Sequence, residues 1–262
     1  MVIDVTYACK MGCTHCMSDC KPDGMNMSIE IFKDSLKFLR KYNIPTWHFS
    51  GGEFFEHPDV LEMIGILSEE MKTMKWPITI STNGRELVRN KEIYDKVNNL
   101  IKKHGKRRVM LQVTDDDRFY PDSLTNKEKY WLGKIVTIME PVPGAPGNKD
   151  KCLYPQGRAI ENFPDSDWYT NGPKCINVRL MVAQGITSIN GIVMHLFAAG
   201  KFCTPTISPD GFIKLGESAL CPPVASIYDD EKTIISKIKN SDCRQCKIAW
   251  DIMDKNMNAY IL

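Results

Sequence analysis

Eight of the ten cysteines of this 262-residue chain fall into two groups. The first group comprises Cys9, Cys13, Cys16 and Cys20, and the second comprises Cys203, Cys221, Cys243 and Cys246. The chain carries 43% hydrophobic residues and shows no secretory signal, so it is expected to build a core in a reducing compartment. Clustered cysteines then favour metal binding or redox chemistry over a disulfide framework.

The first three cysteines follow a predicted strand in the segment Cys9-Lys-Met-Gly-Cys13-Thr-His-Cys16. A [4Fe–4S] cluster normally takes four thiolates, so three of them leave one iron open to another ligand. Zinc is the alternative, because C-x-x-C pairs are common in zinc sites. If the site binds zinc, Cys20 is a candidate fourth ligand. If it holds a cluster, Cys20 is either not involved or a thiol near the substrate.

This C-x-x-x-C-x-x-C spacing resembles the cluster motif of the radical S-adenosylmethionine (SAM) superfamily. The resemblance implies that Cys9, Cys13 and Cys16 hold a [4Fe–4S] cluster whose open iron binds the amino and carboxylate groups of SAM. His15 stands where the family usually has an aromatic residue that packs on adenine, and an imidazole ring can stack in the same way.

A second motif, His48-Phe49-Ser50-Gly51-Gly52-Glu53, follows the second predicted strand. Gly51 and Gly52 permit close approach of the backbone to a ligand, and the carboxylate of Glu53 can pair with an ammonium group. The motif resembles the Gly-Gly-Glu sequence that binds the SAM amino group in the same superfamily.

Polar residues also end the third and fourth predicted strands, where barrel active sites collect ligand contacts. Ser81, Asn83, Gln112 and Thr114 are the candidates, and the resemblance assigns them to the ribose and carboxylate of SAM. Asn83 precedes a glycine, so it equally fits a tight turn.

The second cysteine group brackets a predicted hairpin with the turn Pro209-Asp210-Gly211. Cys203, Cys221, Cys243 and Cys246 provide four ligands, enough to saturate an auxiliary [4Fe–4S] cluster. The arrangement resembles the twitch domain, a shortened SPASM domain, and zinc is again the alternative. Cys152 and Cys175 are expected to be buried free thiols or substitutes for one ligand.

Strand and helix patterns alternate along the first half of the chain. The predicted strands are Val2–Tyr7, Thr46–Phe49, Ile78–Ser81, Val109–Thr114, Ile135–Met139 and Asn177–Val182. Single helices between strands predict βαβ units and a parallel sheet. Together with the resemblance, this predicts an α/β fold, a partial (β/α)6 TIM-like barrel over residues 1–185. Residues 186–262 are predicted to form a small hairpin and helix domain for the auxiliary cluster.

Three charged segments are candidates for other contacts. Arg158, in a Gly-Arg-Ala step that resembles one in SPASM and twitch enzymes, either faces the substrate or forms an ordinary ion pair. Asp115–Arg118 are expected to be solvated loop charges, with the rim of the site as the alternative. The basic run Lys102–Arg108 is either solvated or a docking site for an acidic flavodoxin or ferredoxin.

The formal net charge of +2 gives no case for nucleic acid, and no run of eighteen apolar residues predicts a membrane span. The chain is therefore expected to be cytoplasmic.

The resemblance implies reductive cleavage of SAM to a 5′-deoxyadenosyl radical that abstracts a substrate hydrogen atom. Oxidation of a small molecule (sugar, cyclitol or nucleoside), with the auxiliary cluster as electron acceptor, is the first hypothesis. Maturation of a ribosomally made peptide is the second, disfavoured because no leader-binding domain precedes residue 9. A zinc-stabilised binding or scaffold protein is the alternative of another class, and it leaves the strand-end motifs without a role.

Overall fold

The structure, a computed structural model, describes residues 1–140, 153, 156–164, 182–183, 185–199, 204–216 and 221–241. The chain divides into two compact units. The first comprises Met1–Cys13, Cys20–Pro141 and Ser208–Gly211, and the second comprises Thr14–Asp19, Val142–Ile207 and Phe212–Leu262. The domain boundary at residue 185 stays a prediction.

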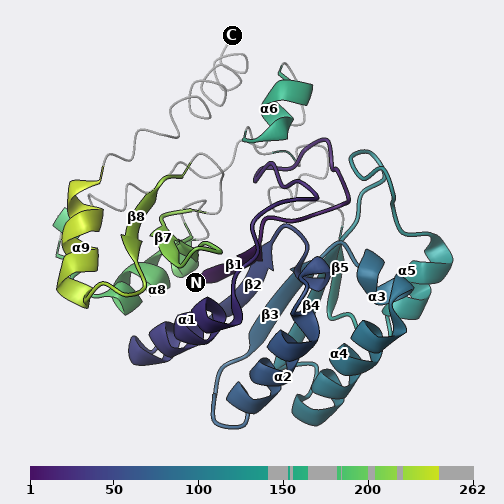
Figure 1. The fold of residues 1–262 in the computed structure, drawn as a ribbon, viewed down its shortest axis with the longest axis horizontal. Helices are drawn as coiled ribbons and strands as arrows, with labels where there is room; N and C mark the ends of the chain where they lie inside the picture. The colour runs from purple at the N-terminus through teal and green to yellow at the C-terminus, as the bar shows by residue number, and fades with distance from the viewer. Residues whose placement is uncertain are drawn as a thin grey trace. The chain divides into compact units, whose positions relative to one another are not determined.

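The first unit is built on five parallel strands in the order β5-β4-β3-β2-β1 (Figure 1). They are β1 (Val2–Thr6), β2 (Trp47–Gly51), β3 (Ile78–Thr82), β4 (Val109–Thr114) and β5 (Ile138–Glu140). Sequential strands lie side by side because a helical crossover follows each of the first four, which confirms the predicted α/β class.

Two predicted strands of this sheet need comment. The fifth was predicted from Ile135, but β5 begins three residues later because Ile135 and Val136 end the turn after α5 and are buried there. The sixth, Asn177–Val182, lies outside the described residues except for Val182.

Helices of the first unit lie along one face of the sheet (Figure 1). They are α1 (Ile29–Lys41), α2 (Val60–Glu70), α3 (Arg85–Arg89), α4 (Lys91–His104) and α5 (Asn126–Leu132), with a short 3-10 turn, η1 (Phe54–Glu56). Side chains fix where they begin: Ser28 accepts a hydrogen bond from the N–H of Ile31, and Asn90 caps α4. Thr125 and Glu128 form a capping box on α5.

Strands β2, β3 and β4 present two chemically different faces, since successive side chains alternate across a sheet. The helix-covered face is buried and largely apolar; Phe49, Ile80 and Leu111 are each 0% exposed. The opposite face is half-buried and largely polar, formed by His48, Ser50, Thr79, Ser81, Met110, Gln112 and Thr114. We call these seven residues the polar face.

The second unit contains three short antiparallel strands, β6 (Thr206–Ile207), β7 (Phe212–Lys214) and β8 (Pro223–Ser226). The predicted Pro-Asp-Gly turn joins the first two, and the N–H of Gly211 donates to Ser208 at 2.9 Å. Its described helices are α6 (Arg158–Asn162), α8 (Ile189–Ala199) and α9 (Glu231–Asn240). The N–H of Ile189, at the start of α8, donates to the side chain of Glu231 in α9.

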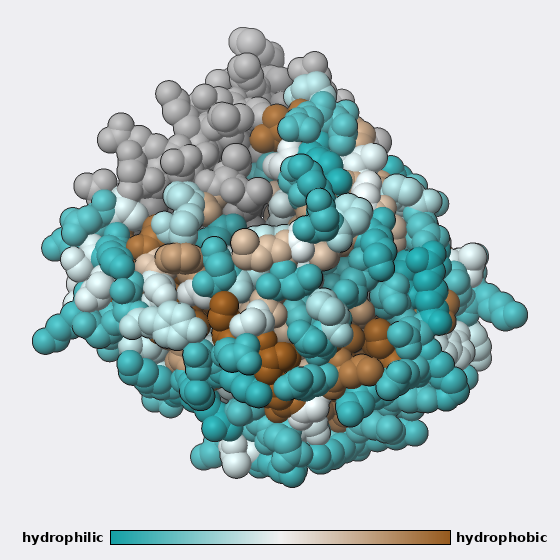
Figure 2. Space-filling view, viewed as in Figure 1, coloured by the Kyte–Doolittle hydropathy of each residue, from teal (hydrophilic) through white to brown (hydrophobic). Residues whose placement is uncertain are grey.

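The surface in Figure 2 is mainly hydrophilic, with hydrophobic residues gathered in small spots. In the part of the chain that the structure describes, no helix is long and apolar enough to cross a membrane.

Candidate active site

The loop that carries the first cysteine group begins and ends at one point beside β1. The N–H of Cys9 donates to Lys21 at 2.9 Å, and the N–H of Tyr7 donates to Met25 at 2.8 Å. A Cβ on Gly24 would lie 2.1 Å from the carbonyl oxygen of Tyr7, so only glycine permits this close return. The loop is thus closed at its base by backbone contacts.

The structure describes five of the cysteines: Cys9, Cys13, Cys16, Cys20 and Cys221. Cys9 and Cys20 are buried, and the other three are half-buried. Among the described residues, no group of three or more His, Cys, Asp or Glu side chains is placed to hold a metal ion. Cys152, Cys175, Cys203, Cys243 and Cys246 lie outside the described residues.

The two glycines after β2 pack against the chain that leaves β1. A Cβ on Gly51 would lie 2.2 Å from the carbonyl oxygen of Thr6, and one on Gly52 would lie 2.1 Å from that of Ala8. The N–H groups of Gly52 and Glu53 donate to these same two carbonyls. The glycines therefore have a packing role in bringing Glu53 beside the start of the cysteine loop.

Glu53 is buried at the carboxyl end of β2 and bonds to the end of β3. Its carboxylate accepts hydrogen bonds from the hydroxyl of Thr82 and the N–H of Asn83, both at 2.7 Å, and from the N–H of Phe55 at 3.1 Å. Burial raises the pKa of Glu53 to about 7, although these three donors oppose the shift. The carboxylate is therefore a buried acid whose described partners are uncharged donors, an environment that a further N–H donor would stabilise.

Asn83 has the turn role that its neighbouring glycine suggested, and it also contacts Glu53. Its side-chain oxygen accepts from the N–H of Arg85 at 2.9 Å, as in an Asx turn, while its own N–H binds Glu53. Ser81 lies on the polar face, with its hydroxyl 2.6 Å from Nε2 of His48. Burial lowers the pKa of His48 to about 4, so the imidazole is neutral at pH 7.

Thr114 contacts a tyrosine that the sequence patterns did not single out. The hydroxyls of Thr114 and Tyr120 are 3.1 Å apart. Burial raises the pKa of Tyr120 above its ordinary value, and nearby Cys13 and Glu53 add to the rise. Tyr120 thus lies among the candidate cluster and SAM residues of the first unit, although no local motif marks a tyrosine six residues beyond a strand.

The expectation that the acidic run after β4 is solvated was wrong for two of its residues. Asp115 and Asp116 are only 6% and 5% exposed. The N–H of Leu124 and the ammonium group of Lys129 bind Asp115, while Arg118 binds both oxygens of Asp116. Burial is tolerated because each carboxylate has a cationic partner and N–H donors.

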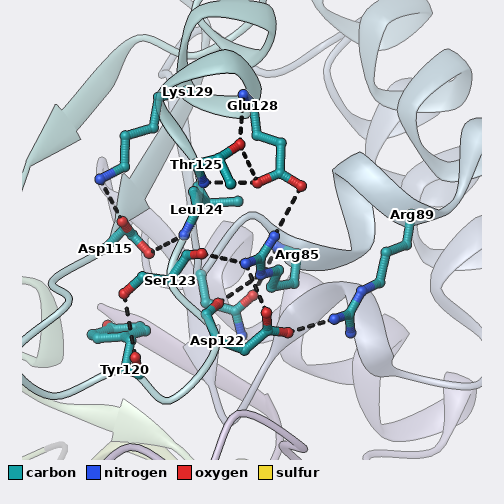
Figure 3. Close-up of polar contacts among 11 residues, drawn as sticks. Arg85, Arg89, Asp115, Tyr120, Asp122, Ser123, Leu124, Thr125, Glu128 and Lys129 are labelled. Atoms are coloured by element: carbon teal, nitrogen blue, oxygen red, sulfur yellow. Dashed lines mark hydrogen bonds and ion pairs between the residues drawn. The ribbon is translucent and has the colours of Figure 1, made fainter.

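Arg85 fixes the loop between β4 and α5 (Figure 3). Its guanidinium donates to the carbonyl oxygens of Asp122 and Ser123 and pairs with the carboxylates of Asp122 and Glu128. The hydroxyl of Ser123 in turn donates to the carbonyl of Tyr120. Because Arg85 lies two residues beyond Asn83, this network connects the end of β3 to the loop that carries Tyr120.

The remaining candidates lie as follows. Gln112 is half-buried on the polar face, and His15 is half-buried in the second unit. In the same unit, Nε of Arg158 lies 3.7 Å from the carboxylate of Asp19, an ion pair with the cysteine loop.

The donor set fits the groups that the motifs imply. Cys9, Cys13 and Cys16 follow one another in one segment and supply the three thiol groups that such a cluster takes, although their side chains are not grouped as a metal site among the described residues. Glu53 is a buried carboxylate at the strand end next to the base of that loop, as an amino-group ligand requires.

Comparisons with known proteins agree with this interpretation. Residues 3–131 match the sequence family described as the Radical SAM superfamily. The antilisterial bacteriocin subtilosin biosynthesis protein AlbA of Bacillus subtilis (strain 168) is 29% identical over 82 residues. That stretch is 31% of this chain and 17% of AlbA, so the match spans less than a fifth of that protein.

Two solved structures share the fold. BtrN in complex with AdoMet and 2-DOIA aligns over 98% of this chain and 88% of its own, with a TM-score of 0.53 and 12% identity. Streptococcus suis SuiB bound to precursor peptide SuiA aligns over 95% of this chain and 66% of its own, with a TM-score of 0.50 and 13% identity. The likeness to these two concerns the fold alone, and the match to the Radical SAM superfamily covers residues 3–131, just under half of the chain.

Proposed function

We propose that this protein is a radical SAM oxidoreductase that takes a hydrogen atom from a small-molecule substrate, with an auxiliary cluster as electron acceptor. When bound, the cluster and SAM supply the one-electron cleavage that yields methionine and the 5′-deoxyadenosyl radical. Cys9, Cys13 and Cys16 are proposed to hold the cluster and Glu53 the SAM amino group.

The observation that carries this proposal is the environment of Glu53. Glu53 is 1% exposed, and the three groups that donate to its carboxylate are uncharged. A buried carboxylate of this kind favours a further hydrogen-bond donor, and the N–H groups of the SAM amino group are such donors. The polar face of β2–β4 supplies further hydrogen-bonding groups on the adjoining strands.

Anaerobic reconstitution tests the proposal. The protein is loaded with iron and sulfide, quantified for both, and incubated with SAM and dithionite. About eight irons per chain and the formation of 5′-deoxyadenosine are expected for two [4Fe–4S] clusters. Four irons with the same product would retain the enzyme class and remove the auxiliary cluster. Bound zinc without SAM cleavage would refute the whole assignment.

Peptide maturation is the second candidate, favoured by the sequence match to AlbA and the fold shared with peptide-bound SuiB. The two candidates separate in a substrate assay, since hydrogen transfer into 5′-deoxyadenosine from a deuterated cyclitol or from a peptide identifies the class. We further propose an acidic flavodoxin or ferredoxin as reductant, docking on the basic run Lys102–Arg108 at the end of α4.

A further inference from the structure

The segment Gly157–Asn162, which includes α6, holds the part of the cysteine loop that belongs to the second unit. The N–H of Arg158 donates to the carbonyl oxygen of Cys16 at 3.0 Å. The side-chain amide of Asn162 donates to the carbonyl oxygen of Thr14 at 2.7 Å, across 148 residues of sequence. The two bonds hold the carbonyls on either side of His15.

Gly157 makes this contact possible. Its φ is +55°, a conformation that L side chains rarely adopt. A Cβ at this position would lie 2.4 Å from the carbonyl oxygen of Cys16 and 2.6 Å from that of Met17. Both obstacles are backbone atoms, so a side chain at residue 157 fits only if the loop itself moves.

A third contact holds the end of the loop. Nε of Arg158 lies 3.7 Å from Asp19, whose backbone has a positive φ of 47°. The side chains of Arg158 and Asp19 are 22% and 43% exposed, so solvent weakens their attraction. The two hydrogen bonds and the close contact of Gly157 therefore contribute more to holding the loop against this segment.

We propose that Gly157 and Asn162 are positioning residues for the cluster ligand Cys16. This inference rests on the proposed function, in which the thiolate of Cys16 binds iron. Partners that orient metal ligands without touching the metal affect its retention strongly, and their loss commonly costs 10- to 100-fold in affinity. The segment therefore acts on the cluster through the backbone of the loop.

The test uses Asn162→Asp in the full-length protein, because a carboxylate cannot donate to the carbonyl of Thr14. Glu161→Gln is the matched control, an exposed neighbour on α6. After anaerobic reconstitution, two quantities are measured: the rate of iron release to a chelator, and the change that SAM produces in the low-temperature EPR spectrum of the reduced protein. SAM perturbs only the cluster that binds it, so the second measurement is specific to that cluster.

Asn162→Asp is expected to release iron about tenfold faster than wild type and to lose the SAM-dependent EPR change, with the thermal unfolding midpoint unchanged. Gly157→Ala is expected to show a larger defect. Its control is Gly185→Ala, since Gly185 also has a positive φ (+105°) but no atom within 4 Å of an added Cβ.

If Asn162→Asp retains iron and the EPR change at wild-type levels, the positioning role is refuted while the proposed function stands. A Gly157→Ala protein that fails to fold leaves the decision to Asn162→Asp. Wild-type protein that takes up no iron overturns the positioning role and the proposed function together.

Discussion

The affinity of the enzyme for SAM should depend on pH through Glu53. Burial raises the pKa of this carboxyl to about 7, whereas the N–H groups of the SAM amino group donate to its charged form. With a pKa near 7, about one tenth of the carboxyls are charged at pH 6 and about nine tenths at pH 8. The dissociation constant for SAM is therefore expected to fall about tenfold between these values, which is about 1.4 kcal/mol.

The same group changes the stability of the protein without ligands, in the opposite direction. Its pKa in the folded state lies above the ordinary value of 4.5, so folded protein keeps a proton that unfolded protein releases. The free energy of unfolding should therefore fall as the pH rises from 4.5 to 7, by about 3 kcal/mol at 1.36 kcal/mol per unit.

Equilibrium dialysis of labelled SAM against reconstituted protein at pH 6, 7 and 8 measures the first effect. Glu53→Gln should remove the pH dependence and weaken binding at pH 8 by about 100-fold, because the SAM amino group loses a buried, charged acceptor. Glu62→Gln is the control, an exposed glutamate on α2, and iron content is measured at each pH. A wild-type affinity that is flat from pH 6 to 8, or a slope that persists in Glu53→Gln, would refute the reasoning.

Four further outcomes are expected. Gly52→Ala should lower the free energy of unfolding, measured by denaturant titration, by about 3 kcal/mol or more, because the added Cβ would overlap backbone atoms. In the same titration Gly65→Ala should raise it by about 0.5–1 kcal/mol, because Gly65 lies in the middle of α2 with no atom within 4 Å of an added Cβ. Tyr120→Phe should weaken SAM binding about fivefold in dialysis, because the candidate SAM residue Thr114 loses its hydrogen bond to the Tyr120 hydroxyl. The unfolding midpoint should change little. Arg85→Met should lower the free energy of unfolding by about 2 kcal/mol in the same titration, because the carboxylates of Asp122 and Glu128 lose their cationic partner. The loss is smaller than for a fully buried ion pair because both carboxylates are partly exposed. As the pH falls from 6.5 to 4, the free energy of unfolding of the wild type should decrease by up to about 3 kcal/mol more than that of His48→Gln. The reason is that the pKa of His48 is lower in the folded protein, so the unfolded state binds the proton more tightly.

The α/β architecture was predictable because its signals are local. Strands and helices produce hydrophobic patterns with periods of 2 and 3.6 residues, which can be recognised within short segments. Single helices between strands imply parallel pairing. The fourth strand, Val109–Thr114, was predicted with its observed bounds, and the Pro-Asp-Gly hairpin was also recognised. The start of β5 was missed because Ile135 and Val136 are apolar for a different reason, their packing at the end of a turn.

The resemblance to the radical SAM superfamily rests on two short motifs in the sequence. Cys9, Cys13 and Cys16 form a motif within eight residues, and Gly51-Gly52-Glu53 lies immediately after a strand. Such motifs can be recognised in a sequence because the residues of each motif lie close together along the chain.

Only the tertiary structure decided which groups these motifs contact within the protein. Gly51 and Gly52 pack against the end of β1 and the residues that follow it, Asp115 is buried against Lys129, and the hydroxyl of Tyr120 contacts that of Thr114. Asn162 binds the carbonyl of Thr14 from 148 residues away. These contacts join segments from different elements, so the burial, partner and pKa of each side chain depend on packing that no local pattern encodes.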